Sequence, residues 1–250
     1  AKIVMLTGPS ASGKTTSAHK VAEALEASGT PAHVISLDNF FKGAQYYPRL
    51  PDGTLDYENP DTLDMPLIRQ CLSDLSTTGK TVLPIYDFTT ESRSSETETL
   101  DLKGGVCIVE GIHALNDDIA GRHPETAKLY ISARSNVNEG SALRFKGTWM
   151  RLVRRAVRDY SFRGTGVADT LKLWANVRRG EKLYISPYKN RADIVFDSSL
   201  PYEVSVMANY AAPLLRAVPE ENARHDELLE LIDAFHWFEP IDPKLVAPDS

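Results

Sequence analysis

Two glycines, a lysine and several hydroxyl side chains crowd into one short stretch near the start of the chain. Residues 8–17 read GPSASGKTTS and fit the pattern G-x-x-x-x-G-K-[ST], with Gly8, Gly13, Lys14 and Thr15 in place. Glycine lets backbone N–H groups turn inward around an anion, and the N-terminus of a following helix adds free N–H groups and partial positive charge. The stretch therefore predicts a cradle for a nucleoside triphosphate, with Lys14 reaching the β- and γ-phosphates. The expected contacts are Gly8, Ser10, Ala11, Ser12, Gly13, Lys14, Thr15 and Thr16.

A magnesium site is expected beside this cradle. The Thr15 hydroxyl can reach a metal held on the phosphates. Glu110 closes the apolar run CIVEG, and in open α/β sheets ligands gather at the carboxyl ends of the strands. A carboxylate there binds Mg²⁺ directly or through water. We expect Thr15 and Glu110 to hold Mg²⁺; the alternative is that Glu110 only caps the next segment.

A second acidic side chain follows another apolar run. Asp38 ends the apolar stretch AHVISLD (32–38), which leads into NFFKG. A carboxylate beside the γ-phosphate can orient an acceptor hydroxyl and take its proton, as in kinases. The alternative is a turn or cap residue, because Asp commonly follows strands. His113, in GIHALN, is interpreted as a structural residue rather than a catalyst.

Six segments extend these motifs into a family resemblance. GPSASGKTT, SLDNFF, DYENPDTLD, PIYDFTTESR, VEGIHAL and RLVRRAVRDYSFRG occur in the order and spacing of the uridine kinase / phosphoribulokinase family. The resemblance covers residues 3 to 203 and is closest to the uridine–cytidine kinase branch. It implies a P-loop NTPase fold, ATP and Mg²⁺ as cofactors, and phosphorylation of a nucleoside 5'-hydroxyl, with Asp38 as the base. Many bacterial members of a similar subgroup carry an extra N-terminal domain, so the start at AKIVML is compatible with truncation of a longer chain.

The resemblance also implies residues for the acceptor. Tyr57 and Glu58, in DYENPD, match an aromatic residue and a carboxylate near the ribose. Tyr86 and Phe88, in PIYDF, match rings that flank the base, which is physically sensible because flat rings hold a base by stacking. The alternative is that these aromatic residues belong to the core.

A basic segment is expected to form a lid. Residues 143–163, LRFKGTWMRLVRRAVRDYSFR, hold seven basic side chains against one acid. The resemblance places Arg155 near the acceptor sugar, and Arg158 and Arg163 over the triphosphate, where a planar guanidinium binds phosphate oxygens in pairs. Arginines 151, 154, 155 and 158 cannot all share one helical face, so we expect some of them to be solvated or paired with acids.

The chain departs from the family pattern on the acceptor side. Glu91 stands where a base-reading histidine is common, Phe41 where tyrosine is common, and Glu58 where aspartate is usual. The lid carries Thr165 instead of a second arginine after glycine. Because a carboxylate only accepts hydrogen bonds, Glu91 favours an amino or ring N–H donor over a carbonyl. We therefore expect an altered base preference.

These motifs need an α/β scaffold to position them. Short apolar runs alternate with helical stretches, which favours a mostly parallel sheet covered by helices on both faces. The expected strands are 2–7, 32–38, 105–111, 127–133 and 191–199, with a helix over 14–28. An antiparallel hairpin is inserted at about 80–103, with KTVLPIYDF (80–88) and TETLDLK (97–103) as its strands. The lid spans about 143–168, and the tail from 225 forms a closing amphipathic helix. The organisation predicted is one domain over 1–250.

Composition and charge argue against several other classes of protein. The net charge is −6 over 250 residues, which argues against a general nucleic-acid binder. No apolar run approaches the roughly 20 residues that cross a bilayer, and no signal-peptide layout is present, so a cytoplasmic protein without a membrane partner is expected. Two cysteines far apart make no disulfide framework or zinc site. A homo-oligomer is left open by the resemblance.

Two other functions stay open from the sequence. The fold could serve a different small alcohol, such as a sugar phosphate or pantothenate. The chain could also be a regulatory nucleotide-binding module with little turnover, although Asp38 argues against that because a sensor needs no proton acceptor. A small-molecule nucleoside acceptor is the expected partner.

Overall fold

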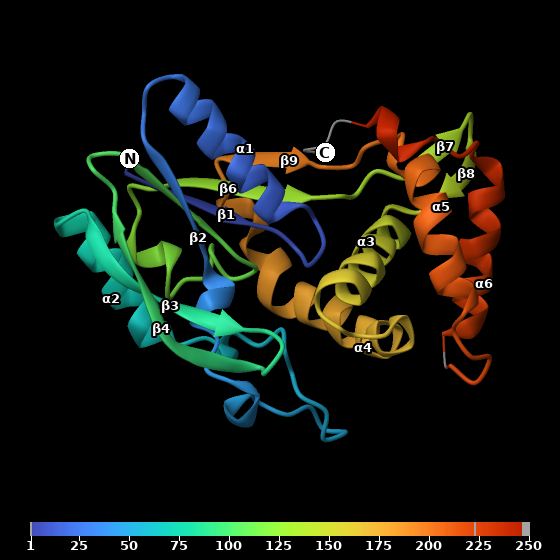
Figure 1. The fold of residues 1–250 in the computed structure, drawn as a ribbon, viewed down its shortest axis with the longest axis horizontal. Helices are drawn as coiled ribbons and strands as arrows, with labels where there is room; N and C mark the ends of the chain where they lie inside the picture. The colour runs from blue at the N-terminus through green and yellow to red at the C-terminus, as the bar shows by residue number, and fades with distance from the viewer. Residues whose placement is uncertain (1, 223, 247–250) are drawn as a thin grey trace. The chain divides into compact units, whose positions relative to one another are not determined.

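The computed structural model describes residues 2–222 and 224–246. The chain forms two compact units (Figure 1). The first comprises residues up to 131 together with 176–196, and the second comprises 132–175 together with the residues from 197 onward. The single domain expected over 1–250 stays a prediction.

A five-stranded sheet organises the first unit and carries the nucleotide-binding motif. Its strands are β1 (Ile3–Thr7), β2 (Ala32–Ser36), β5 (Val106–Glu110), β6 (Ala127–Ser132) and β9 (Ile194–Asp197). Their order is β2-β5-β1-β6-β9, and the pairs β2–β5, β5–β1 and β1–β6 are parallel. The expected α/β class with a mostly parallel sheet is confirmed.

Helices cover both faces of this sheet because its strands are apolar on both sides. Alternate residues of β5 divide between two cores: Val109 packs with α2 (Met65–Thr77), whereas Ile108 packs with α1 (Lys14–Ala27). Continuous apolar strands of this kind are typical of a parallel sheet buried between helical layers. The sheet edge where the strands end is therefore held rigidly from both sides.

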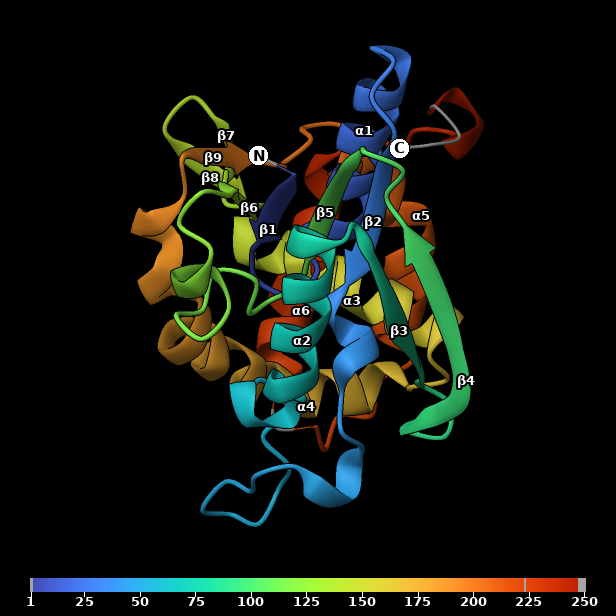
Figure 2. The same cartoon turned by 90° about the vertical axis from the view of Figure 1, so that its left-hand side faces the viewer.

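The inserted hairpin lies beside α2 (Figure 2). It consists of β3 (Lys80–Asp87) and β4 (Ser92–Asp101), which pair antiparallel. Instead of beginning at residue 97, as the sequence predicts, β4 begins at Ser92, and the turn is confined to residues 88–91. The first half of β4 is polar on both faces and partly or fully exposed, so it lacks the alternation by which a strand is recognised.

The second unit is mostly helical. It contains the hairpin β7 (Val137–Glu139) and β8 (Ala142–Phe145), and the helices α3 (Gly147–Phe162), α5 (Glu203–Arg216) and α6 (His225–Ala234). Helix α4 (Val167–Gly180) starts in this unit and ends in the first. Phe145 packs against Trp149 and Phe235. The closing helix expected from residue 225 is confirmed as α6.

Several shorter helical turns complete the described chain. The 3-10 turns are Leu37–Phe40, Ala44–Tyr46, Pro60–Thr62, Ala120–Arg122, Ser186–Arg191, Phe235–Trp237 and Pro243–Leu245, and a π-helical turn spans Glu181–Ile185. Among the residues described, no helix has the length and apolarity to cross a lipid bilayer.

Candidate active site

The glycine-rich loop connects the end of β1 to the start of α1. A Cβ on Gly8 would lie 1.8 Å from the carbonyl oxygen of Ile131, so only glycine fits where the loop passes over β6. Ala11 and Gly13 have φ of 59° and 81°, in the left-handed region, and such turns direct successive N–H groups into one anion-binding concavity. Lys14 Nζ donates to the Pro9 carbonyl oxygen at 3.1 Å, across the loop. The loop has the shape and charge that a triphosphate requires.

The two residues expected to hold magnesium are in contact. Thr15 Oγ1 donates to Glu110 Oε1 at 3.2 Å, and Glu110 is only 3% exposed. Burial raises the pKa of the Glu110 carboxyl, as does the nearby negative charge of Asp38, whereas the positive charge of Lys14 lowers it. A buried carboxylate beside a hydroxyl suits Mg²⁺, which typically takes one or two carboxylates and completes its shell with water and phosphate oxygens.

Asp38 reaches the same sheet edge from β2. Ser36 is the register partner of Glu110, and the chain then turns into the 3-10 helix in which the backbone N–H of Asp38 donates to Ser36 Oγ at 3.4 Å. Because the charges of both Asp38 and Lys14 act on the Glu110 carboxyl, these three side chains gather in one place. Lys14 and Asp38, with 23 residues between them in the chain, are thus both brought close to Glu110.

Aromatic side chains gather next to Asp38. Tyr86 lies with its ring centroid 5.5 Å from that of Phe41 and 5.2 Å from that of Phe88, and Tyr47 lies 5.6 Å from Tyr57. The Tyr47 and Tyr86 hydroxyls are 3.1 Å apart. We call these five residues the aromatic cluster. Tyr86 is 7% exposed and Phe88 38% exposed, so the cluster extends from the core to the surface.

Glu91 lies close to the aromatic cluster. It occupies the turn of the hairpin with φ of 48°, and its backbone carbonyl oxygen accepts from the N–H of Ala44 at 3.3 Å. Burial raises the pKa of the Tyr57 hydroxyl, and the negative charge of Glu91 raises it further. The same charge contributes at Tyr47 and Tyr86. Tyr47 was missed by the sequence analysis, because an isolated loop tyrosine carries no periodic signal.

Arg93 fixes the segment that follows Asp38. From β4 it pairs with Asp64 at 3.1 Å and donates to the carbonyl oxygens of Phe40 and Phe41, both at 3.4 Å. Tyr86 contributes from β3, since its N–H donates to Asn39 Oδ1 at 3.3 Å. The hairpin is thereby tied to the residues around Asp38, a link that the sequence motifs alone did not show.

Glu58 is buried, with 6% of its surface exposed. The end of α4 packs directly on it: a Cβ on Gly180 would lie 2.2 Å from the Glu58 Cβ. His113 is fully buried nearby, and burial, reinforced by the positive charge of Lys14, lowers its pKa to about 4. Its imidazole is therefore neutral at physiological pH, as befits a structural residue.

The expected lid arginines lie on and just after α3, in the second unit. Arg155, Arg158 and Arg163 all pair with Asp159, at 3.2, 2.7 and 3.9 Å. Arg154 instead forms a bidentate pair with Glu203. The expectation that some of these arginines pair with acids is confirmed. Asp159 was missed, although its spacing of four residues from Arg155 is typical of helical ion pairs. The role of the arginines at the triphosphate stays a prediction.

The site combines a strand, a glycine-rich loop and a helix with carboxylates near the ends of two neighbouring strands. This combination is typical of the P-loop kinases, which are phosphotransferases. The model of the Phosphoribulokinase / Uridine kinase family matches residues 3–205. The chain belongs to this family, whose kinases use ATP as phosphate donor.

Individual relatives agree with this assignment. A uridine kinase from Lactobacillus helveticus is 29% identical over 206 residues, covering 82% of this chain and 90% of its own. A uridine-cytidine kinase-like 1 protein from Mus musculus is 33% identical, over 76% of this chain and 32% of its own.

Solved structures share the fold. A possible uridine kinase from Bacillus stearothermophilus has a TM-score of 0.54 at 19% identity, covering 78% of this chain and 88% of its own. The phosphoribulokinase from Rhodobacter spheroides has a TM-score of 0.53 at 16% identity, covering 80% and 74%.

Proposed function

We propose that this kinase transfers the γ-phosphoryl group of ATP to the 5'-hydroxyl of a nucleoside. The observation that carries the proposal is the convergence of Lys14, Asp38 and Glu110 at one sheet edge beside the aromatic cluster. The glycine-rich loop and Lys14 suit the triphosphate of ATP, and the flat rings next to them suit a nucleobase. The uridine kinases among the relatives support the same acceptor class.

The chemistry follows from the side chains present. Loop N–H groups and Lys14 hold the β- and γ-phosphates. The oxygen of the acceptor hydroxyl attacks the γ-phosphorus in line, while Asp38 accepts the proton of that hydroxyl. The new O–P bond forms while the bond to the β-phosphate oxygen breaks, and ADP leaves with that oxygen. Mg²⁺ held by Thr15 and Glu110 would neutralise charge on the phosphates. Arg158 and Arg163 would add charge neutralisation, and Arg155 would contact the sugar.

Base preference is expected to follow Glu91. Its carboxylate accepts hydrogen bonds and donates none, so a base that presents an exocyclic amino group to it fits better than one that presents a carbonyl group. Tyr86 and Phe88 would stack on the base, while Tyr57 and Glu58 would contact the ribose. We propose that uridine itself is a weaker substrate than an amino-bearing nucleoside.

The test is acceptor-dependent ADP release from ATP and Mg²⁺. The panel contains amino-bearing and carbonyl-bearing nucleosides, a sugar phosphate and pantothenate, each with wild type and Asp38→Asn. A nucleoside kinase releases ADP only with a nucleoside, and Asp38→Asn keeps ATP-analogue binding but loses most turnover. Glu23→Gln, an exposed carboxylate of α1 paired with Lys20, is the control that keeps full activity. Turnover with another alcohol alone, or binding without turnover, would refute the nucleoside assignment; a clear preference for uridine would refute the role given to Glu91.

A further inference from the structure

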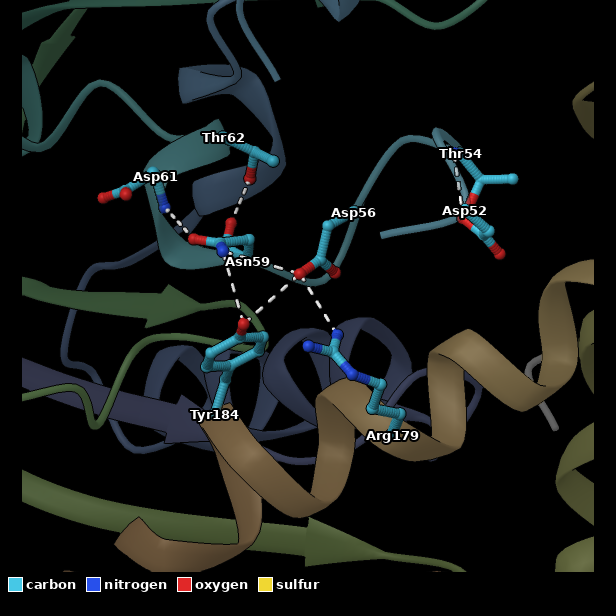
Figure 3. Close-up of polar contacts among 8 residues, drawn as sticks. All are labelled: Asp52, Thr54, Asp56, Asn59, Asp61, Thr62, Arg179 and Tyr184. Carbon is cyan, nitrogen blue, oxygen red and sulfur yellow. Dashed lines mark hydrogen bonds and ion pairs between the residues drawn. The ribbon is translucent and has the colours of Figure 1, made fainter. Parts of the chain in front are cut away.

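A buried carboxylate lies two residues before Glu58, at the start of DYENPD, and has been given no role so far. Asp56 is 3% exposed. Three donors converge on its Oδ2 atom: Arg179 Nη1 at 3.3 Å, the Tyr184 hydroxyl at 3.3 Å and Asn59 Nδ2 at 3.5 Å (Figure 3). We call these four residues the Asp56 cluster. Its members come from two segments more than 120 residues apart, since Asp56 and Arg179 are separated by 123 positions.

Arg179 supplies the positive charge that the buried carboxylate of Asp56 needs. A buried ionised carboxylate needs an opposite charge and hydrogen bonds, because burial removes its hydration. Its second oxygen, Oδ1, is buried and has no hydrogen-bond partner among the described residues. The positive charge of Arg179 and two neutral donors therefore all act on the one paired oxygen. Loss of Arg179 would leave the carboxylate buried with no cation in its hydrogen-bonding shell.

The cluster sets the path of the chain on both sides of Glu58. Asp56 precedes Glu58, and Asn59 follows it. Asn59 donates to Asp56 and to the Tyr184 hydroxyl at 3.3 Å, while its Oδ1 accepts from the N–H of Asp61 at 2.9 Å (Figure 3). The Glu58 peptide unit is thus held at both ends.

A third contact presses on Glu58 itself from the same side. Gly180, next to Arg179, leaves no room for a Cβ, because that atom would lie 2.2 Å from the Glu58 Cβ. The segment 179–184 therefore supplies both long-range donors, Arg179 and Tyr184, and also packs directly on Glu58. A shift of this segment would move Glu58.

We propose that Asp56 is a positioning residue of the acceptor site: paired with Arg179 and Tyr184, it holds Glu58 where the acceptor's sugar binds. This inference rests on the proposed function, which places Glu58 at the sugar. Asp56 acts through Glu58 and touches neither ATP nor the reacting atoms. The cluster therefore governs the binding of the acceptor and leaves that of the nucleotide unchanged.

The test separates acceptor binding from ATP binding by steady-state kinetics. Asp56→Asn, Arg179→Met and Tyr184→Phe are each compared with wild type. Misplacement of a substrate-contacting group costs up to about 100-fold, so we expect the acceptor KM to rise by about 10- to 100-fold in the first two variants, with the ATP KM unchanged. Arg179→Lys keeps the charge and should recover much of the loss. Arg178→Met is the matched control, because Arg178 pairs with Glu181 and not with Asp56.

A second readout does not depend on turnover. Hydrogen–deuterium exchange of residues 56–62 should be faster in Arg179→Met than in wild type and unchanged in Arg178→Met, because opening of this segment controls its exchange. If wild type phosphorylates no nucleoside, the proposed function fails, and exchange still tests the cluster. Any of three results would overturn the positioning role. The acceptor KM could stay unchanged in Asp56→Asn and Arg179→Met, the ATP KM could rise by the same factor as the acceptor KM, or the exchange of residues 56–62 could stay unchanged in Arg179→Met.

Discussion

His113 offers a quantitative test of how the site is buried. The pKa of its imidazole falls from an ordinary value of 6.5 to about 4, chiefly because burial excludes the charged form, with the positive charge of Lys14 adding to the effect. In the unfolded chain the same imidazole binds a proton near pH 6.5. Between these two values the unfolded state holds more protons than the folded state, so stability rises with pH.

The size of the effect follows from the two pKa values. A difference from 6.5 to about 4 corresponds to about 3 kcal/mol of unfolding free energy. This contribution is fully present above about pH 6.5 and is lost as the pH falls towards 4. The substitution His113→Gln removes the titrating group, and its packing cost does not depend on pH. We therefore expect the stability gap between wild type and variant to shrink by about 3 kcal/mol between pH 7 and pH 4.

The assay is urea unfolding at several pH values, followed by far-UV circular dichroism. Tryptophan fluorescence does not suit it, because all three tryptophans (Trp149, Trp174 and Trp237) lie in the second unit and His113 lies in the first. Ile108→Val is the control: it removes one buried methylene from β5 and no titratable group, so its cost of about 1 kcal/mol should be the same at every pH. If the difference in unfolding free energy between wild type and His113→Gln is also the same at every pH, the imidazole of His113 is not buried in its neutral form.

Three further substitutions test other parts of the site. Gly8→Ala places a Cβ 1.8 Å from the Ile131 carbonyl oxygen, so thermal unfolding should show a loss of about 2 kcal/mol or more, together with weaker ATP-analogue binding; unchanged stability and binding would mean that the loop does not pass so close to β6. Lys14→Met should lower kcat/KM by about 100- to 1000-fold, as removal of a charge-stabilising donor does, and a smaller loss in acceptor-dependent ADP release would remove Lys14 from the phosphate cradle. Glu91→Gln adds a donor at that position, so the ratio of kcat/KM for carbonyl-bearing over amino-bearing nucleosides should rise by about tenfold; an unchanged ratio would show that Glu91 does not read the base.

The geometry of the glycine-rich loop and of the carboxylates beside it could be predicted well from sequence. A strand, glycine-rich loop and helix are contiguous in the chain, so the position of Lys14 relative to Gly8 follows from local geometry. Glu110 and Asp38 could be placed at the same edge because parallel strands end together. The structure adds the direct contact of Thr15 with Glu110.

The acceptor half could be predicted only in part. Tyr57, Glu58, Tyr86 and Phe88 were expected at the acceptor through the family resemblance and not from their pattern, and that role stays a prediction. Tyr47 was missed because it gains its place in the aromatic cluster only when the hairpin folds back. The start of β4 was missed because a strand with polar residues on both faces leaves no periodic signal.

The order of residues along the chain determined the glycine-rich loop and the alternation of strands with helices that favours a parallel sheet, because residue types and apolar periodicity within short segments predict both. Only the tertiary structure decided that Asp56 meets Arg179 and that Gly180 packs on Glu58. Such contacts join segments more than 120 positions apart, and no local propensity encodes a distance between side chains that approach each other only after the core has formed.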